Sequence, residues 1–224
     1  MKRTLSFLLI FALMLALASC GSAAGQSGAG SAPASKEEVP ASDALETSPE
    51  NQPEDEPHTG TDNGEKKILI TYFSATNNTE SIANHLSEIL DADIYKIVPE
   101  TPYTPDDLNY NTDCRANREQ NDASARPAIS GSVDNMEQYD VIFLGYPIWW
   151  GQAPKIISTF LESYDLSGKT IVPFCTSGSS GIGSSATNLH SLASSATWLD
   201  GQRFSGGASS ADVQSWVDGL NLNG

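Results

Sequence analysis

The stretch "ILITYFSATNNTESIA", residues 68–83, places a very polar turn between an apolar run and a helical pattern. The apolar and aromatic run at 68–73 is typical of a strand that is covered on both faces of a sheet. The turn "SATNNT" at 74–79 has five hydroxyl or amide side chains and no Lys or Arg. A chain reversal needs only one or two such residues, so this turn is predicted to surround a polar ligand. Apolar residues then recur at helical spacing, at Ile82, Ala83, Leu86, Ile89 and Leu90.

Strands and helices alternate along the rest of this region. Pro154 suits the first turn of a helix, and Pro173 is expected near the end of its strand or at a bulge. This alternation predicts an α/β fold, a three-layer doubly wound five-stranded parallel sheet in the order 2-1-3-4-5. The remaining strands are predicted at 92–99, 141–144, 169–174 and 198–204, and the remaining helices from Pro154, over roughly 182–195, and at 213–220.

One segment interrupts the alternation. Residues 101–138 contain no convincing strand and at most one helix, near 106–121. This polar segment stands where a single crossover helix belongs, so we predict an elaborated connection, which is called the excursion below.

Two further loops are predicted beside the polar turn, because ligands of such sheets bind beyond the carboxyl ends of the strands. The loop "GYPIWWGQAP" at 145–154 carries two adjacent Trp that cannot both face the core, and aromatic rings suit stacking on a planar ligand. The loop "TSGSSGIGSS" at 176–185 has glycines that let the backbone approach a ligand, although alone it would be interpreted as a flexible loop. The helix after the polar turn offers free N–H groups to a phosphate. Together the three loops favour an aromatic mononucleotide.

These motifs give residues 66–224 a resemblance to the flavodoxin family, in particular to flavodoxin-like domains of exported bacterial lipoproteins and reductases. "SATNNT" is similar to the family's FMN phosphate loop, Ser/Thr-x-Thr-Gly-x-Thr, with Asn77 in place of the Gly. Asn is the residue that best tolerates a left-handed conformation after Gly. "GYPIWWG" is similar to the family's Gly-x-Pro-Thr-Trp segment, with Ile148 in place of the hydroxyl residue and Trp149 against the flavin. The resemblance implies that FMN is bound by Ser74, Ala75, Thr76, Asn77, Asn78, Thr79, Pro147, Ile148, Trp149, Trp150, Gly151, Thr176, Ser177, Gly178, Ser179 and Gly181.

The resemblance also implies a redox function, either as an FMN-dependent NAD(P)H or quinone oxidoreductase or as an electron carrier. The loop at 176–185 lacks the Tyr that classical flavodoxins place on the outer flavin face, which leaves room for a substrate and favours the reductase. No side chain is a convincing proton-transfer catalyst, and no Cys or His cluster has the spacing of metal ligands, so neither a catalytic residue nor a metal site is predicted. The alternative is a non-enzymatic module that binds another phosphorylated ligand, but phosphate alone needs no aromatic wall. A hydrolase built on His190 has no nucleophile-elbow motif.

The first 65 residues are predicted to lie outside the folded domain. Lys2 and Arg3 precede an apolar run that ends in "LASC", so residues 1–19 are predicted to be a lipoprotein signal peptide and Cys20 to be acylated. The run is shorter than the about 20 residues of a transmembrane span. Residues 21–65 hold ten acids, one Lys and no aromatic residue, which is typical of a disordered tether. With its lipidated Cys, segment 20–65 is expected to anchor the domain to a membrane, outside the cytoplasm.

Charge and cysteine content narrow the partners further. The chain has a formal net charge of −16, and residues 66–224 hold nine Lys or Arg against eighteen Asp or Glu. A surface this acidic argues against nucleic acid and anionic lipid as partners. The resemblance implies a small-molecule electron donor or acceptor, or a redox protein, as the partner. Cys114 and Cys175 are expected to be free thiols, and the histidines are expected at the surface, at positions 58, 85 and 190.

Overall fold

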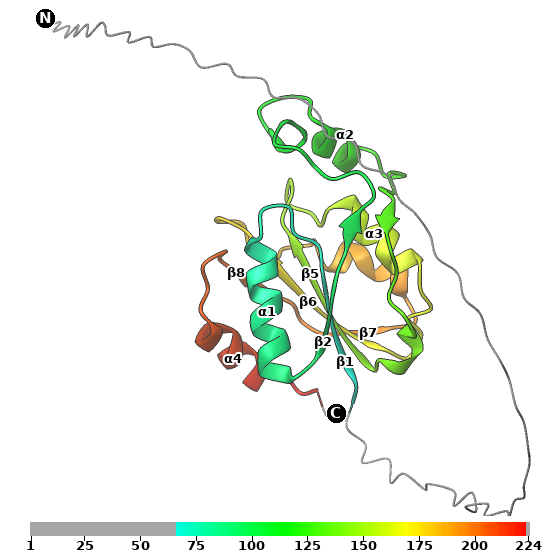
Figure 1. The fold of residues 1–224 in the computed structure, drawn as a ribbon, viewed down its shortest axis with the longest axis vertical. Helices are drawn as coiled ribbons and strands as arrows, with labels where there is room; N and C mark the ends of the chain where they lie inside the picture. Colours follow the sequence, from blue (N-terminus) through cyan, green and yellow to red (C-terminus); the bar gives the residue numbers. More distant parts are fainter. Residues whose placement is uncertain (1–65, 223–224) are drawn as a thin grey trace, which may run out of the picture. The chain divides into compact units, whose positions relative to one another are not determined.

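The computed structural model describes residues 66–222. The predicted signal peptide, the acylated Cys20 and the acidic tether lie outside these residues. In chain order (Figure 1) the elements are β1 Ile68–Tyr72, α1 Asn78–Leu90, β2 Asp93–Lys96, β3 Val98–Pro99, η1 Asp106–Leu108, α2 Arg115–Asn121, β4 Ile129–Ser130, η2 Met136–Gln138, β5 Val141–Pro147, α3 Lys155–Glu162, β6 Thr170–Thr176, η3 Thr187–Ala193, β7 Thr197–Trp198, β8 Gln202–Phe204 and α4 Ser210–Asp218.

A parallel sheet in the order β2-β1-β5-β6 forms the centre of the fold, and β7 and β8 both pair with the far side of β6. Because β7 and β8 share one position, the observed order is the predicted 2-1-3-4-5, and the predicted doubly wound α/β fold is confirmed. The single strand predicted at 198–204 is wrong in detail. It is two short strands, with β7 beside the first half of β6 and β8 beside the second half.

Helices cover both faces of the sheet, as the apolar run of β1 predicts. Ile70 and Tyr72 pack in the core that includes α1 and α4, whereas Leu69 and Phe73 pack in the core that includes α3 and η3. Figure 1 shows α1 and α4 together on one side of the sheet. The buried face of α1 consists of Thr79, Ile82, Ala83 and Leu86, and that of α3 includes Ile156, Ile157, Phe160 and Leu161.

Two predicted helices begin later than expected. α3 begins at Lys155, and Pro154 is its N-cap, with an extended ψ of 144°, and not part of the first turn. The helix predicted over 182–195 is only the 3-10 helix η3. Its late start follows from residues 183–185, Gly-Ser-Ser, because Gly and Ser favour turns over helix interiors.

Pro173 lies in the interior of β6, contrary to the prediction. On one side it pairs with Leu144 of β5, and on the other side it faces the break between β7 and β8. Gly201 passes this break so closely that a Cβ there would lie 2.8 Å from the Pro173 carbonyl oxygen. The nitrogen of Pro173 faces the same side as its carbonyl, so its missing hydrogen falls where the neighbouring strand is interrupted.

The excursion contains several short elements instead of one helix. A turn at 109–114 separates η1 from α2, and in it Asn109 accepts hydrogen bonds from the N–H groups of Asn111 (3.2 Å) and Thr112 (3.0 Å). Such local bonds compete with the helix. β4 lies in the excursion, where no strand was predicted, and pairs with β3 in a two-stranded antiparallel sheet. The predicted strand at 92–99 is therefore divided, at the buried Ile97, into β2 and β3.

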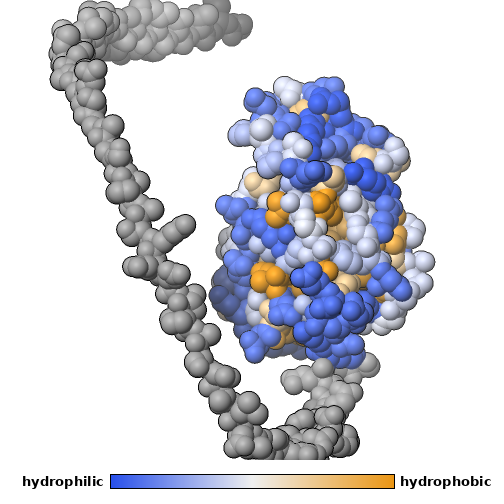
Figure 2. All heavy atoms as spheres, turned by 45° about the vertical axis from the view of Figure 1, so that its right-hand side comes forward, coloured by the Kyte–Doolittle hydropathy of each residue, from blue (hydrophilic) through white to orange (hydrophobic). Residues whose placement is uncertain are grey.

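The surface of the described region is mainly hydrophilic on the face shown in Figure 2, with small separate hydrophobic areas. None of the helices within residues 66–222 is long and apolar enough to span a membrane. Cys114 and Cys175 are free, as predicted, and both are buried. His85 and His190 are half-buried, so their predicted surface position is only partly right.

Candidate functional site

Three loops meet at the carboxyl edge of the sheet. They follow β1, β5 and β6, which are neighbours in the sheet, at Tyr72, Pro147 and Thr176. The sequence prediction that the three loops lie together is therefore confirmed.

The turn before α1 has the backbone of a phosphate cup. Asn77 is the N-cap of α1 and adopts the left-handed conformation, with φ 63° and ψ 0°, as its place in the motif predicts. The first bond of the helix runs from the N–H of Ser81 to the carbonyl of Asn77 (3.1 Å), and the Asn77 side chain makes no capping bond. The N–H groups of the first turn, at 78–80, therefore point out of the helix end. Together with the helix dipole they suit an anion.

The side chains of this turn have two different roles. Thr76 and Asn78 are exposed, and the Asn78 amide donates to the Thr76 hydroxyl (3.1 Å). Thr79 is completely buried, and its hydroxyl shares a hydrogen bond of 2.8 Å with the hydroxyl of Thr176. Thr79 therefore joins the first loop to the third instead of facing a ligand.

A cavity of about 370 Å³, called the polar hollow below, lies between the three loops and the segment after β8. A Cβ on Gly206 would lie 2.4 Å from the side-chain oxygen of Asn78, so a larger residue here would displace the Asn78 side chain. None of the lining residues is charged. They are Thr76, Asn78, Pro147, Ile148, Trp149, Thr176, Ser177, Gly178, Ser205, Gly206 and Gly207.

Arg203 holds the third loop in place from β8. Its guanidinium donates to the carbonyls of Ser177 (2.6 Å) and Gly178 (2.9 Å) and to the hydroxyl of Ser177 (3.1 Å). Cys175 lies just before this loop, and burial raises the pKa of its thiol to about 12, which keeps it neutral. The backbone of the third loop is therefore held by Arg203, and the neighbouring Cys175 is not a thiolate nucleophile.

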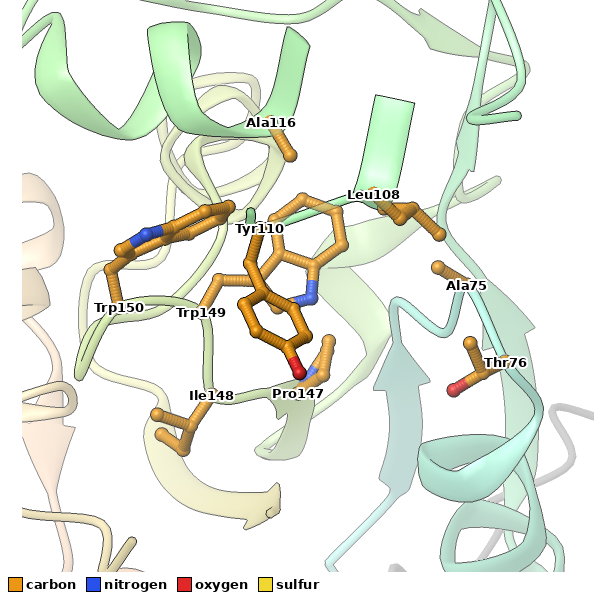
Figure 3. A pocket seen from close by; sticks show the side chains of 9 residues that line it. All are labelled: Ala75, Thr76, Leu108, Tyr110, Ala116, Pro147, Ile148, Trp149 and Trp150. Atoms are coloured by element: carbon orange, nitrogen blue, oxygen red, sulfur yellow. The ribbon is translucent and has the colours of Figure 1, made fainter. Parts of the chain in front are cut away.

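Figure 3 shows a second cavity, of about 410 Å³, which is called the aromatic hollow below. The two cavities share Thr76, Pro147, Ile148 and Trp149. The complete lining of the aromatic hollow is Ala75, Thr76, Leu108, Tyr110, Ala116, Pro147, Ile148, Trp149 and Trp150.

Trp149 forms a fixed wall between the two hollows. Its ring packs edge-on against Phe73 (centroids 5.5 Å apart) and Tyr103 (5.2 Å). Burial and a hydrogen bond to Glu119 raise the pKa of Tyr103 well above its usual value, so this neighbour stays neutral. Aromatic pairs of this kind contribute about 0.5–1.5 kcal/mol beyond the area that they bury.

Trp150 points outward from a tight hairpin. Paired bonds between Trp149 and Gln152 (2.9 and 3.0 Å) close the hairpin. The two residues at its tip, Trp150 and Gly151, have φ values of 47° and 77°. For a bulky residue this left-handed backbone costs about 1–2 kcal/mol. Trp150 is nevertheless 46% exposed, as expected for a pair of Trp that cannot both face the core.

A family model described as Flavodoxin matches residues 67–220. The chain belongs to the flavodoxin family. A solved structure from Bacteroides eggerthii, assigned as a flavoprotein, is 43% identical and covers 70% of this chain and 99% of that chain, with a TM-score of 0.67. A flavoprotein from Lactobacillus acidophilus, solved in complex with FMN, is 24% identical and covers 68% of this chain and 99% of that chain, with a TM-score of 0.52. No curated protein matches the chain.

Of the sixteen residues that were predicted to bind FMN in this flavodoxin domain, ten line one or both hollows. Ser74, Asn77, Thr79, Gly151, Ser179 and Gly181 line neither; Asn77 and Thr79 shape the loops as described, and Ser179 and Gly181 are exposed in the third loop. His190 stacks on Trp198, with centroids 4.6 Å apart, and lines neither hollow. Among residues 66–222 no group of His, Cys, Asp and Glu could hold a metal ion.

The sequence prediction missed two segments of the site. The segment at 205–207 has a weak signal, a Ser-Gly-Gly run directly after a predicted strand. The excursion has none, yet it brings Leu108, Tyr110 and Ala116 to the aromatic hollow. In Figure 3 the Tyr110 side chain reaches across this hollow toward Pro147. The flavodoxin domain thus receives from the excursion an aromatic side chain that its third loop lacks.

Proposed function

We propose that this domain binds FMN in the polar hollow and acts as a redox protein, either an oxidoreductase or an electron carrier. One observation carries the proposal: the uncharged cup at the N-terminus of α1 and the aromatic wall of Trp149 belong to the same hollow. The FMN complex of the Lactobacillus acidophilus relative and the 43% identity to the flavoprotein from Bacteroides eggerthii support it.

The residues present suit the parts of FMN. The N–H groups of the first turn of α1, the Thr76 hydroxyl and the Asn78 amide are donors for a phosphate, and no carboxylate lines the hollow to repel it. Pro147, Ile148 and Trp149 offer apolar surface to a ring. When bound, the cofactor supplies the electron-transfer chemistry. The protein binds and orients it, and the Thr79–Thr176 bond and Arg203 keep the loops in register.

Flavin titration tests the assignment of the cup. Thr76→Ala or Asn78→Ala should weaken FMN binding by about 1–3 kcal/mol, because a hydrogen bond to a charged group is lost. Thr197→Ala, on β7 beside the opposite end of β6, is the matched control and should bind FMN normally. Riboflavin, which lacks the phosphate, should bind the unmodified protein much more weakly than FMN. Equal affinity for FMN and riboflavin would show that the turn before α1 does not hold the phosphate, and would overturn the proposal.

We also propose that the protein is a lipoprotein, anchored through Cys20 and held outside the cytoplasm by residues 21–65. The apolar run that ends in "LASC" and the acidic composition that follows it support this proposal. Cys20→Ser should move the protein from the membrane fraction to the soluble fraction without changing its flavin content. Ser22→Ala, two positions away, should stay with the membrane. Release of both variants, or of neither, would count against acylation of Cys20.

A further inference from the structure

The Trp149 wall continues into the excursion through a second aromatic side chain, Tyr103. The two rings pack edge to face, with centroids 5.2 Å apart and an angle of 82° between their planes. Phe73 touches both rings, at centroid distances of 5.5 Å to Trp149 and 5.8 Å to Tyr103. Tyr103 itself lines neither hollow. An electron can therefore pass from Tyr103, which lies outside both hollows, to Trp149 by direct ring contact.

Tyr103 has a proton acceptor in place. Its hydroxyl donates to Oε2 of Glu119, whose side chain is 17% exposed. Burial and this carboxylate raise the pKa of Tyr103 well above its usual value, so the phenol carries its proton at rest. A phenol that loses an electron becomes a very strong acid and must lose this proton as well. A base within hydrogen-bond reach is the geometric requirement for that transfer, and Glu119 meets it.

Arg115 fixes the geometry of the tyrosine and its acceptor. The guanidinium lies over the Tyr103 ring, 4.2 Å from the centroid, and its Nε donates to Oε1 of Glu119 (2.7 Å). It also donates to the carbonyl of Thr101 (2.9 Å), so it keeps an acceptor when Glu119 is protonated. A cation over a ring opposes a positive charge on that ring. Tyr103 is therefore expected to give up its electron and its proton together.

We propose that Tyr103 is a redox-active residue that restores Trp149 after Trp149 has lost an electron. The inference rests on the proposed function, because the oxidant is the light-excited ring of FMN beside Trp149. Trp149 gives one electron to this ring and becomes a radical cation. Tyr103 then gives one electron to Trp149 and its hydroxyl proton to Oε2 of Glu119. Trp149 is then neutral again and Tyr103 is a neutral radical, and the return of the electron from the flavin and of the proton from Glu119 closes the cycle.

A flash of blue light on the FMN-loaded protein, followed by transient absorption, tests the inference. The Trp radical should decay while the Tyr radical rises with the same time constant. Tyr103→Phe keeps the ring but removes the hydroxyl, so the Tyr radical should be lost and the Trp radical should live longer. Glu119→Gln replaces the base with a neutral acceptor and should slow the transfer. Heavy water should also slow the transfer in the unmodified protein, because a proton moves in the same step.

Two further variants identify the residues that carry the radicals. Tyr110→Phe removes the hydroxyl of the tyrosine that lines the aromatic hollow, and it should behave as the unmodified protein. Loss of the Tyr radical in Tyr110→Phe, or its survival in Tyr103→Phe, would overturn the inference. Trp149→Phe, saturated with FMN, should form no Tyr radical, and a Tyr radical in this variant would show that the electron does not pass through Trp149.

Flavin titration separates a failure of this inference from a failure of the proposed function. The dissociation constant for FMN should stay the same in Tyr103→Phe, Glu119→Gln and Tyr110→Phe, because none of these residues lines the polar hollow. If FMN binds but the Trp radical has the same lifetime in Tyr103→Phe and in the unmodified protein, only the inference is wrong. A protein that binds no FMN overturns the proposed function as well.

Discussion

Asn77 and Gly206 shape the phosphate cup through the backbone. Asn77 takes the left-handed conformation that turns the chain into α1, where the family motif has Gly. Gly206 leaves room for Asn78, whose amide donates to Thr76. The sequence shows the first feature, because Asn stands inside a recognisable motif. The second depends on a contact between residues 128 positions apart, which no local pattern encodes.

Gly206→Ala should weaken FMN binding by about 1–3 kcal/mol, because the added methyl group displaces the Asn78 amide. Gly207→Ala adds the same methyl group to the same hollow, but its Cβ meets no atom within 4 Å. FMN titration of both variants checks the prediction. Equal losses would mean that the hollow is merely crowded, and that the position of Asn78 is unimportant.

At the scale of elements, Gln120 fastens the excursion to the loop after β5. Its amide nitrogen donates to the carbonyls of Trp149 (3.1 Å) and Ala153 (3.2 Å), and its oxygen accepts from the N–H of Lys155 (3.1 Å). One side chain thus ties α2 to the Trp149 wall and to the start of α3. The sequence predicts an elaborated connection at this position. It cannot predict where the connection lies, because short elements with few apolar residues are positioned by such long-range bonds.

Gln120→Ala should loosen the excursion without unfolding the sheet. The free energy of unfolding should fall by about 1–3 kcal/mol, because three partly buried backbone groups lose their partner. Amide hydrogen exchange should accelerate in α2 and remain slow in β1 and β5. Gln214→Ala, which removes one exposed bond to Asp218 on α4, is the control and should change neither quantity. Uniform acceleration across the sheet would contradict the role given to Gln120.

At the scale of the whole molecule, groups buried in the neutral form link stability to pH. Burial raises the pKa of Cys175 to about 12. Burial, assisted by Glu80, raises the pKa of Tyr72 to about 12, and burial together with a hydrogen bond to Asp93 raises the pKa of Tyr139 to about 12. In the unfolded chain Cys loses its proton near pH 8.5 and Tyr near pH 10, both values being approximate. The unfolded state therefore binds fewer protons than the folded state above about pH 8.5, so stability falls as pH rises from there to about 12.

Urea unfolding between about pH 7 and pH 11 should show this fall. Cys175→Ala should make the dependence on pH shallower, whatever it does to stability at neutral pH. Cys114→Ala removes the other thiol and serves as the comparison. An unchanged slope in Cys175→Ala would show that the Cys175 thiol does not contribute to the pH dependence.

The centre of the sheet was predictable because β1, β5 and β6 are continuous, mainly buried apolar runs. β1 and β5 and their neighbouring helices carry enough buried residues for their periodicity to identify them. The division between β7 and β8 was not predictable, because it depends on the close approach of Gly201, which lies between these two strands, to Pro173 of β6. The fold topology places Thr79 and Thr176 near each other. The hydrogen bond between their hydroxyls, however, could not be predicted from the sequence.

The position of the excursion between β2 and β5 has an evolutionary consequence. The excursion contributes Leu108, Tyr110 and Ala116 to the aromatic hollow and no strand to the parallel sheet. Selection can therefore alter the length and side chains of this segment while the loops that form the phosphate cup keep their sequence. Related proteins could in this way differ in what the aromatic hollow accommodates while the three strand-end loops stay the same.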